Sequence, residues 1–247
     1  MDFLINHAER AFGIHLSKRQ QRQFYSYYDE LVKWNNLFNL TSITDLREVQ
    51  TRHFLDSLRI SKVFDDKNLC DKAKVLDLGS GAGLPGIPLK IAFPKLELTL
   101  LDATAKKTDF LSHVVDILDL DGIKVCNRRS EHLAHVDGYR ENYDVVLSRA
   151  VANLSVLAEL ALPFCKLGGF VVVIKGPEVE KEVLESKVAI ELMGGQLFSV
   201  QSSESSWDNR VANLITLDKN RLTPAKYPRR PGMPTKRPIG VRQDQPI

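Results

Sequence analysis

The sequence has little cysteine and no long hydrophobic run. Its three cysteines, Cys70, Cys126 and Cys165, are widely spaced and form no Cys-x-x-Cys pair, which argues against a disulfide framework and against a zinc site. His132 and His135 lack carboxylate or cysteine partners at ligand intervals, and apart from His53 the histidines show no metal spacing, so we expect no metal. The longest apolar runs, such as 170–174, fall far short of the ~18 residues of a membrane span. Charged residues near the N-terminus leave no room for a signal peptide. We therefore expect a cytoplasmic protein without a membrane partner.

The remaining composition is that of a globular protein with an uneven charge. The chain has 247 residues, 43% of them apolar, and a net charge of +3. Residues 219–242 contain eight basic residues and no acidic one, whereas the rest of the chain has 26 basic and 31 acidic residues. Such a basic segment indicates a polyanionic partner, and a solubilising or disordered tail is the alternative. Its five prolines argue against helix and strand there.

The first 68 residues are nearly free of glycine and proline and have the pattern of helices. Ser17 is suited to cap a helix over 18–38, in which aromatic residues recur every three or four positions. A second helix is expected over 45–64. We expect four aromatic residues of this region to be core and interface residues in place of platforms for base stacking, namely Trp34, Tyr25, Tyr27 and Tyr28. His53 and Asp56 share a helix face, and a structural role for them is favoured over a place in a pocket.

From residue 72 onward, short apolar runs alternate with helical stretches. The runs predict seven strands, at 74–78, 96–101, 123–126, 143–148, 170–175, 197–200 and 211–217. Helices are expected at 85–93, 104–118, 154–165 and 178–192. This alternation predicts an α/β fold with a doubly wound, mostly parallel sheet. The last two strands have no helix between them and are expected to pair antiparallel. We divide the chain into a helical N-terminal extension (1–68), a sheet domain (69–218) and a basic tail (219–247).

The strongest local signal is a glycine-rich loop between the first predicted strand and its helix. Gly79, Gly81 and Gly83 alternate after Asp77. Such glycines allow a tight turn and a close approach of the backbone to a ligand, next to the unsatisfied N–H groups of a helix N-terminus. A dinucleotide or S-adenosylmethionine would fit this geometry, and a glycine turn without a ligand is the alternative.

Two carboxylates favour S-adenosylmethionine over a dinucleotide. Asp77 would repel a pyrophosphate, whereas it can accept a hydrogen bond from an ammonium group or brace the loop. Asp102 ends the second strand, where a carboxylate can accept both ribose hydroxyls. After the third strand, backbone groups of Ser130 and Glu131 are placed to contact the adenine, although the same two residues alone would be interpreted as a helix cap.

Several elements together resemble the RsmG family, formerly glucose-inhibited division protein B. They are Trp34-Asn35, Asn39-Leu40-Thr41-Ser42-Ile43, Arg52-His53-Phe54-Leu55-Asp56-Ser57-Leu58, the 77–86 loop, Ser148-Arg149-Ala150, Lys175-Gly176 and Tyr227-Pro228-Arg229-Arg230-Pro231-Gly232. The resemblance spans nearly the whole chain. It implies the Rossmann-like fold of class I methyltransferases and transfer of a methyl group from S-adenosyl-L-methionine to guanine N7 in the 530 loop of 16S ribosomal RNA.

The resemblance also implies site residues. It places cofactor contacts at Gly79 and Leu84, at the backbone of Ser130 and Glu131, and at Arg149, which is also our candidate for positioning the base. The expected partner is 16S ribosomal RNA or an assembling small subunit, and the following residues would bind its phosphates: Lys175, Arg229, Arg230, Lys236 and Arg237. Two alternatives stay open, namely an RNA-binding assembly factor with a vestigial pocket and a methyltransferase acting on a small molecule or a protein.

Overall fold

The computed structural model describes residues 1–67, 69, 72–149, 152–205 and 207–241. The chain forms two compact units, a first unit of Met1–Arg128 and a second unit of Arg129–Ile247. Among the described helices, none combines the length and apolar character that crossing a membrane requires.

Three parallel strands form the core of the first unit. They are β1 (Lys74–Leu78), β2 (Glu97–Asp102) and β3 (Ile123–Asn127). The register pairs Leu78 with Leu101 and Asp102 with Asn127, so the carboxyl ends of the strands meet at one edge. The apolar runs that predicted β1 and β2 are buried in them, apart from the first residue of each strand.

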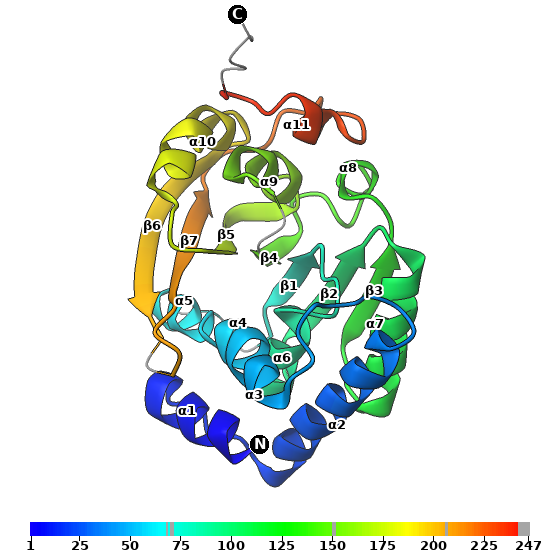
Figure 1. Ribbon diagram of the computed structural model, residues 1–247. Coiled ribbons are helices and arrows are strands. Elements are labelled where there is room, and N and C mark those ends of the chain that lie inside the picture. Colours follow the sequence, from blue (N-terminus) through cyan, green and yellow to red (C-terminus); the bar gives the residue numbers. More distant parts are fainter. Residues whose placement is uncertain (68, 70–71, 150–151, 206, 242–247) are drawn as a thin grey trace, which may run out of the picture. The chain divides into compact units, whose positions relative to one another are not determined.

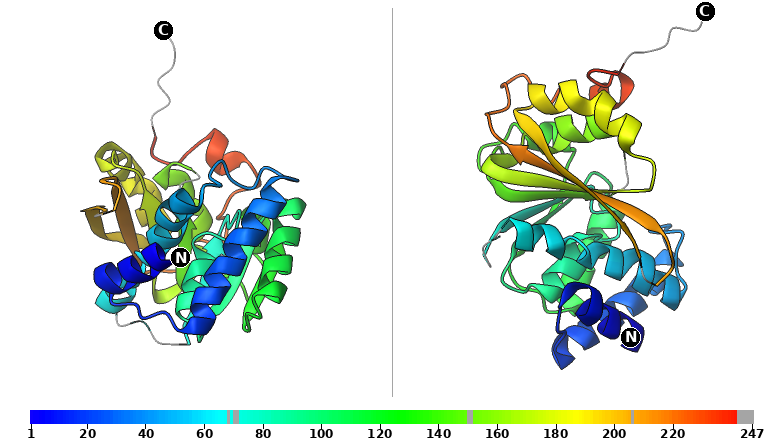
Figure 2. Two further views of the ribbon diagram at one scale, coloured as in Figure 1. Left: turned by 60° about the horizontal axis from the view of Figure 1, so that its bottom comes forward. Right: turned by 90° about the vertical axis from the view of Figure 1, so that its left-hand side faces the viewer.

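The crossover helices of this unit follow the predicted positions closely. They are α6 (Gly86–Ala92) and α7 (Ala105–Ile117). Helix α2 (Lys18–Asn35) begins after the predicted cap, Ser17, whose hydroxyl accepts the Gln20 amide in a capping box. Helices α2 and α7 lie side by side (Figures 1 and 2).

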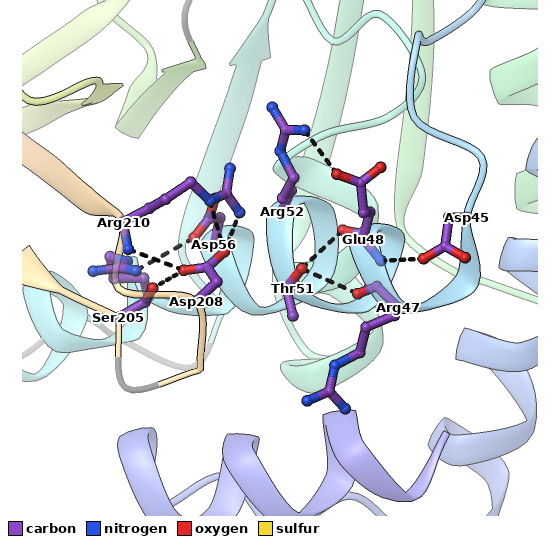
Figure 3. A network of polar contacts seen from close by, with 10 residues as sticks. Asp45, Arg47, Glu48, Thr51, Arg52, Asp56, Ser205, Asp208 and Arg210 are labelled. Carbon is purple, nitrogen blue, oxygen red and sulfur yellow. Dashed lines mark hydrogen bonds and ion pairs between the residues drawn. The ribbon is translucent and has the colours of Figure 1, made fainter.

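The predicted second helix is a helical run that changes type along its length. It consists of α3 (Leu46–Glu48), the π-helix η1 (Val49–Leu55), α4 (Asp56–Leu58) and α5 (Ser61–Asp66), and α1 (Asp2–Phe12) is a separate helix at the start of the chain. Asp45 caps the run by accepting the Glu48 amide at 2.9 Å, and the Thr51 hydroxyl donates to the carbonyls of Arg47 and Glu48 (Figure 3). The π-helix carries Arg52 and His53. Such segments are rare in soluble proteins and are frequent at functional sites.

The second unit contains one parallel and two antiparallel strand pairs. Strands β4 (Tyr143–Arg149) and β5 (Cys165–Lys175) are parallel, whereas β7 (Val211–Lys219) is antiparallel to both β5 and β6 (Gly195–Glu204). The long β6–β7 ribbon is visible in Figure 2. The predicted antiparallel pairing of the last two strands is confirmed. The described residues contain seven strands in all, and the predicted mostly parallel α/β sheet is confirmed.

Helices α8 (Ser130–Leu133), α9 (Leu154–Ala161) and α10 (Glu180–Leu192) complete the body of the second unit. The tail differs from the prediction. Lys219 is the fully buried last residue of β7, and α11 (Met233–Lys236) is a helix whose first turn contains a proline. Proline suits a first helical turn, because the N–H it lacks would have no partner there. The prediction that prolines exclude helix from the tail was therefore wrong.

Candidate active site

The glycine loop joins β1 to α6 in the first unit. Gly79, Gly81 and Gly83 all have positive φ angles, of 73°, 57° and 88°, as the alternating pattern predicts. The start of the loop is held to the neighbouring strand, because the amides of Gly79 and Ser80 donate to the Leu101 carbonyl at 2.8 and 3.0 Å. The Ser80 hydroxyl in turn accepts the Leu101 amide at 3.1 Å. The turn is thus a fixed continuation of the sheet edge.

Asp77 braces this loop from beneath. Its side chain is fully buried, and its Oδ2 accepts the amide of Gly86 at 2.9 Å. A Cβ at position 86 would lie 2.7 Å from that oxygen, so glycine is needed there for close packing. The sequence left two roles open for Asp77. The burial and this hydrogen bond support the bracing role over a direct contact with a ligand's ammonium group.

Two glycines of the loop are required for different reasons. A Cβ at Gly83 would lie 2.9 Å from Ile87 Cγ1 and 3.0 Å from the Tyr27 hydroxyl, inside the protein's own packing. Beyond the two adjacent residues of the chain, the nearest atom to a Cβ at Gly81 would be the Gly79 carbonyl oxygen, at 3.8 Å. Gly81 therefore faces open space, where a ligand can approach the backbone.

Asp102 lies beside the loop at the end of β2. Its side chain is 9% exposed. Oδ2 accepts the Gly81 amide at 3.0 Å, and Oδ1 accepts the Thr104 amide at 2.8 Å. Lys107 Nζ lies 3.8 Å from Oδ2, an ion-pair distance that is too long for a hydrogen bond. A carboxylate offers about four acceptor positions, so the two amide bonds leave one position on each oxygen. The side chain can hold the loop and still accept two hydroxyl groups.

The N-terminal helices contribute a contact to the loop that the sequence did not predict. The Tyr27 hydroxyl, from α2, donates to the Ala82 carbonyl. Its ring stacks on Phe54 of η1, with 5.3 Å between ring centroids. The expectation that Tyr27 belongs to the core or an interface agrees with its full burial. Its partner is 55 residues away in sequence, so no local pattern indicates it.

In the second unit, the predicted adenine contacts lie at the start of α8. The helix begins at Ser130, and its cap residue is Arg129 rather than Ser130. Glu131 is buried, and its carboxylate accepts the Gly232 amide of the tail at 3.0 Å. The backbone contacts predicted for Ser130 and Glu131 stay predictions, as does the role of Arg149, which ends β4 and is half-buried.

Two of the predicted phosphate-binding residues already have carboxylate partners. Lys175 is only 12% exposed, pairs with Glu182 at 2.6 Å and also donates to the Ala152 carbonyl. Arg229 forms a two-pronged pair with Glu159, at 2.9 Å from Nε and 2.6 Å from one terminal nitrogen. These charges are neutralised within the protein. Both residues thus have a structural role within the second unit, and the phosphate contacts predicted for them stay predictions.

The Arg229–Glu159 pair anchors the tail. Glu159 is 1% exposed, and its hydrogen bond to the guanidinium raises the pKa of Arg229. The Arg229 amide also donates to Glu159, at 2.8 Å. Arg140 donates to tail carbonyls of Thr223 and Tyr227 at 2.8 and 2.9 Å. The tail is thus folded onto the second unit as far as it is described.

Other basic residues of the tail, unlike Arg229, are exposed to solvent. The exposed basic residues among those predicted to bind RNA are Arg230, Lys236 and Arg237. All three follow Arg229 within eight residues, and the Arg237 carbonyl accepts a hydrogen bond from Arg229 at 2.8 Å. The exposed positive charges of the tail therefore lie on a folded turn and not on a free chain.

Comparison with known proteins identifies the family. The profile of GidB, described as rRNA small subunit methyltransferase G, matches residues 20–211. Relatives named ribosomal RNA small subunit methyltransferase G, from Bacillus cytotoxicus and Bacillus cereus, are 43% and 42% identical over 92% of this chain and 94% of their own. The chain belongs to the GidB family. The resemblance noted from the sequence motifs is confirmed.

Solved structures with low sequence identity share the fold of this GidB family member. A 16S rRNA adenine-N1 methyltransferase from Catenulisporales acidiphilia has a TM-score of 0.52, at 11% identity, over 65% of this chain and 91% of its own. TrmN from Thermus thermophilus has a TM-score of 0.51, at 16% identity, over 69% and 53% of the two chains. At such identities the likeness shows the fold alone, which is the predicted methyltransferase fold.

The residues present fit the methyl donor of the GidB family, S-adenosylmethionine. The open space beside Gly81 admits a ligand against the backbone, and Asp102 keeps acceptor positions suited to a ribose diol. Within the described part of the chain, no group of three histidine, cysteine or acidic side chains could hold a metal ion.

Proposed function

We propose that this protein transfers a methyl group from S-adenosylmethionine to N7 of a guanine in 16S ribosomal RNA. The observation that carries the proposal is the loop geometry in a chain of the GidB family, where Gly81 is open to a ligand and Asp102 retains acceptor positions. The relatives' name states ribosomal RNA of the small subunit as their substrate. The choice of guanine N7 rests on the motif resemblance.

The chemistry requires positioning more than acid–base catalysis. Guanine N7 carries a lone pair and no hydrogen. The bond from N7 to the methyl carbon forms while the sulfur–methyl bond breaks, and the sulfur leaves as a neutral thioether. No proton has to leave N7 for this step. The protein's task is to hold the base in line with the methyl group and to exclude water.

Each of the two units contributes its own residues to the proposed site roles. In the first unit, Gly79, Gly81 and Asp102 bind the cofactor, while Asp77 and Gly83 maintain the loop. In the second unit, Ser130, Glu131 and Arg149 keep the cofactor contacts predicted from the sequence, with Arg149 also positioning the base.

Three exposed tail residues, Arg230, Lys236 and Arg237, are proposed to bind phosphates. The proposed substrate is the small-subunit RNA, alone or within an assembling subunit, and the proposed compartment is the cytoplasm.

Mapping of the methylated base tests the proposal. Ribosomal RNA from cells lacking the protein is incubated with the purified protein and labelled S-adenosylmethionine, and N7-methylguanine is located by chemical cleavage. One new N7-methylguanine in 16S RNA is expected. A protein that binds the cofactor and labels only a small molecule or a protein would support the same-fold alternative. A protein that binds RNA and no cofactor would support the assembly-factor alternative.

A further inference from the structure

Helices α2 and α7 form an antiparallel pair that leads from one edge of the first unit to the other. Arg19 bonds Asp119 at 2.7 Å at one end, and Glu30 bonds His113 at 2.7 Å near the middle. Helix α7 starts just after Asp102, at the carboxyl edge of the strands. Because α2 runs in the opposite direction, its C-terminal end lies at the same edge (Figures 1 and 2). The last turn of α2 is therefore on the cofactor side of this unit.

The chain that leaves α2 forms a loop, residues 36–43, which is held by hydrogen bonds. Asn35 Oδ1 accepts the amides of Leu40 and Thr41, each at 2.9 Å. The Thr41 hydroxyl accepts the Ile43 amide at 3.1 Å and lies 2.9 Å from Nε2 of His53, which is buried in η1. Hydrogen bonds within and between the family motifs at 39–43 and 52–58 therefore hold a surface loop beside the edge of the sheet where the cofactor is expected.

The outer side of this loop combines apolar, amide and basic groups. Leu37 is 73% exposed, and Asn36 and Asn39 are exposed as well. Lys106, at the start of α7, is exposed and stands over the Phe38 ring, with Nζ 4.9 Å from the ring centroid. Unpaired RNA is bound through this set of groups, because amides reach base edges, apolar and aromatic groups contact base faces, and lysine meets phosphate.

We propose that the 36–43 loop and Lys106 form an RNA-binding surface that receives the unpaired segment around the target guanine. This inference rests on the proposed function and adds a substrate contact in the first unit to that function. Leu37 is a large apolar side chain in solvent. Beside the loop, Lys106 has no carboxylate partner among the described residues, unlike Arg229, which pairs with Glu159. RNA is favoured over a protein partner by that charge and by the exposed amides.

The test uses the full-length protein and a synthetic RNA hairpin carrying the 530 loop. The variants are Lys106→Gln and Asn39→Ala, singly and together. The matched control is Lys18→Gln, which removes one exposed positive charge at the opposite end of α2. RNA affinity is measured at several salt concentrations, cofactor affinity by calorimetry, and folding by thermal melting.

The double variant should bind the hairpin about tenfold more weakly, on the scale of one phosphate and one base contact. Lys106→Gln alone should make the slope of log affinity against log salt shallower by about one. Cofactor affinity should stay within twofold of the wild type, and Lys18→Gln should change neither quantity. If the melting temperature of the double variant falls, Leu37→Ser gives a second, single-site test of the same surface.

Wild-type methylation separates this inference from the proposed function. If the wild type methylates N7 and the loop variants bind and methylate the hairpin unchanged, the RNA-binding surface is wrong while the function stands. If the variants fail only on an intact small subunit, the loop contacts a protein, which also overturns the inference. If the wild type methylates no RNA, the proposed function itself fails.

Discussion

At the scale of single residues, the glycine loop separates positions that serve packing from positions that serve a ligand. Gly81→Ala should leave the melting temperature within a few degrees of the wild type while weakening S-adenosylmethionine binding at least tenfold, because its Cβ would point into open space at a positive φ. Calorimetry and thermal melting measure the two effects.

Gly83→Ala is the matched control for that experiment. Its Cβ would meet Ile87 and the Tyr27 hydroxyl, so it should lower stability by about 1–3 kcal/mol. An unchanged cofactor affinity in Gly81→Ala would reject the loop as a binding site.

The second residue-scale prediction concerns Asp102. Asp102→Ala should weaken cofactor binding by about 1–3 kcal/mol, since it removes a charge-assisted acceptor. Asp102→Glu should be milder, because a carboxylate remains. The alanine variant also removes the acceptor of the Gly81 and Thr104 amides. Calorimetric titration measures the cofactor affinity of the wild type and of both variants. Equal affinity for all three proteins would show that Asp102 only stabilises the end of β2.

Cys165 provides a residue-scale test of the packing in the second unit. Burial raises the pKa of its thiol to about 12, so at pH 8 only about one molecule in ten thousand carries the reactive thiolate. The native protein should therefore resist maleimide at Cys165 and become labelled there only after unfolding. Peptide mass spectrometry identifies the modified cysteine. Rapid labelling of Cys165 in the native state would show that its thiol is accessible to solvent and would contradict its burial.

At the scale of elements, the Arg229–Glu159 ion pair holds the basic tail against the second unit. Arg229→Met should destabilise the second unit by about 3 kcal/mol, because Glu159 would stay buried without its cation. Arg230→Gln should change stability by less than about 0.5 kcal/mol, as an exposed substitution does, and should flatten the salt dependence of RNA binding.

Urea unfolding and a filter-binding salt series separate the two arginines. The reverse pattern, with Arg229 governing RNA affinity and Arg230 governing stability, would contradict a structural role for the Arg229–Glu159 pair.

The α2–α7 pair offers an element-scale prediction with a pH dependence. The hydrogen bond from Lys33, with a further one from His113, holds the pKa of Glu30 below its usual value. A carboxyl group whose pKa is lower in the folded than in the unfolded state stabilises the fold above the unfolded value and loses that effect as the pH falls through the folded value.

Glu30→Gln should therefore lower the free energy of unfolding by about 1 kcal/mol at pH 7, and the difference should shrink below about pH 4. Denaturant titrations at both pH values measure it. A difference that grows in acid would contradict the assignment.

Helices, strands and the glycine loop are the parts of the molecule that local sequence patterns predict. The strands, the crossover helices and the 77–86 loop follow from local patterns, because apolar runs and glycine spacing reflect local backbone requirements. The carboxylate partners of Lys175 and Arg229 do not. Glu159 lies 70 residues from Arg229, and a charge count cannot show that a basic residue already has a buried partner. The π-helix likewise has no signal in apolar periodicity.

At the scale of the whole molecule, the basic tail is folded onto the second unit, and the proposed transfer to N7 needs no general base. Both features predict that substrate binding and chemistry depend on different residues. Variants of Arg230, Lys236 and Arg237 should raise the Michaelis constant for RNA, while variants of the glycine loop should act on the cofactor. A steady-state matrix of these variants against both substrates would show this division, and a uniform loss of turnover in all of them would contradict it.

The most direct test of the central claim replaces one atom of the substrate. A hairpin carrying the 530 loop is prepared with guanine and with 7-deazaguanine at the proposed target, so that a C–H group stands where N7 would accept the methyl. Methyl transfer from labelled S-adenosylmethionine is measured for both, with binding measured in parallel. The account predicts transfer to the guanine hairpin and none to the 7-deaza hairpin, with both RNAs bound to within a few fold. Equal transfer to both hairpins would show that the methyl group goes to another atom and would contradict the account.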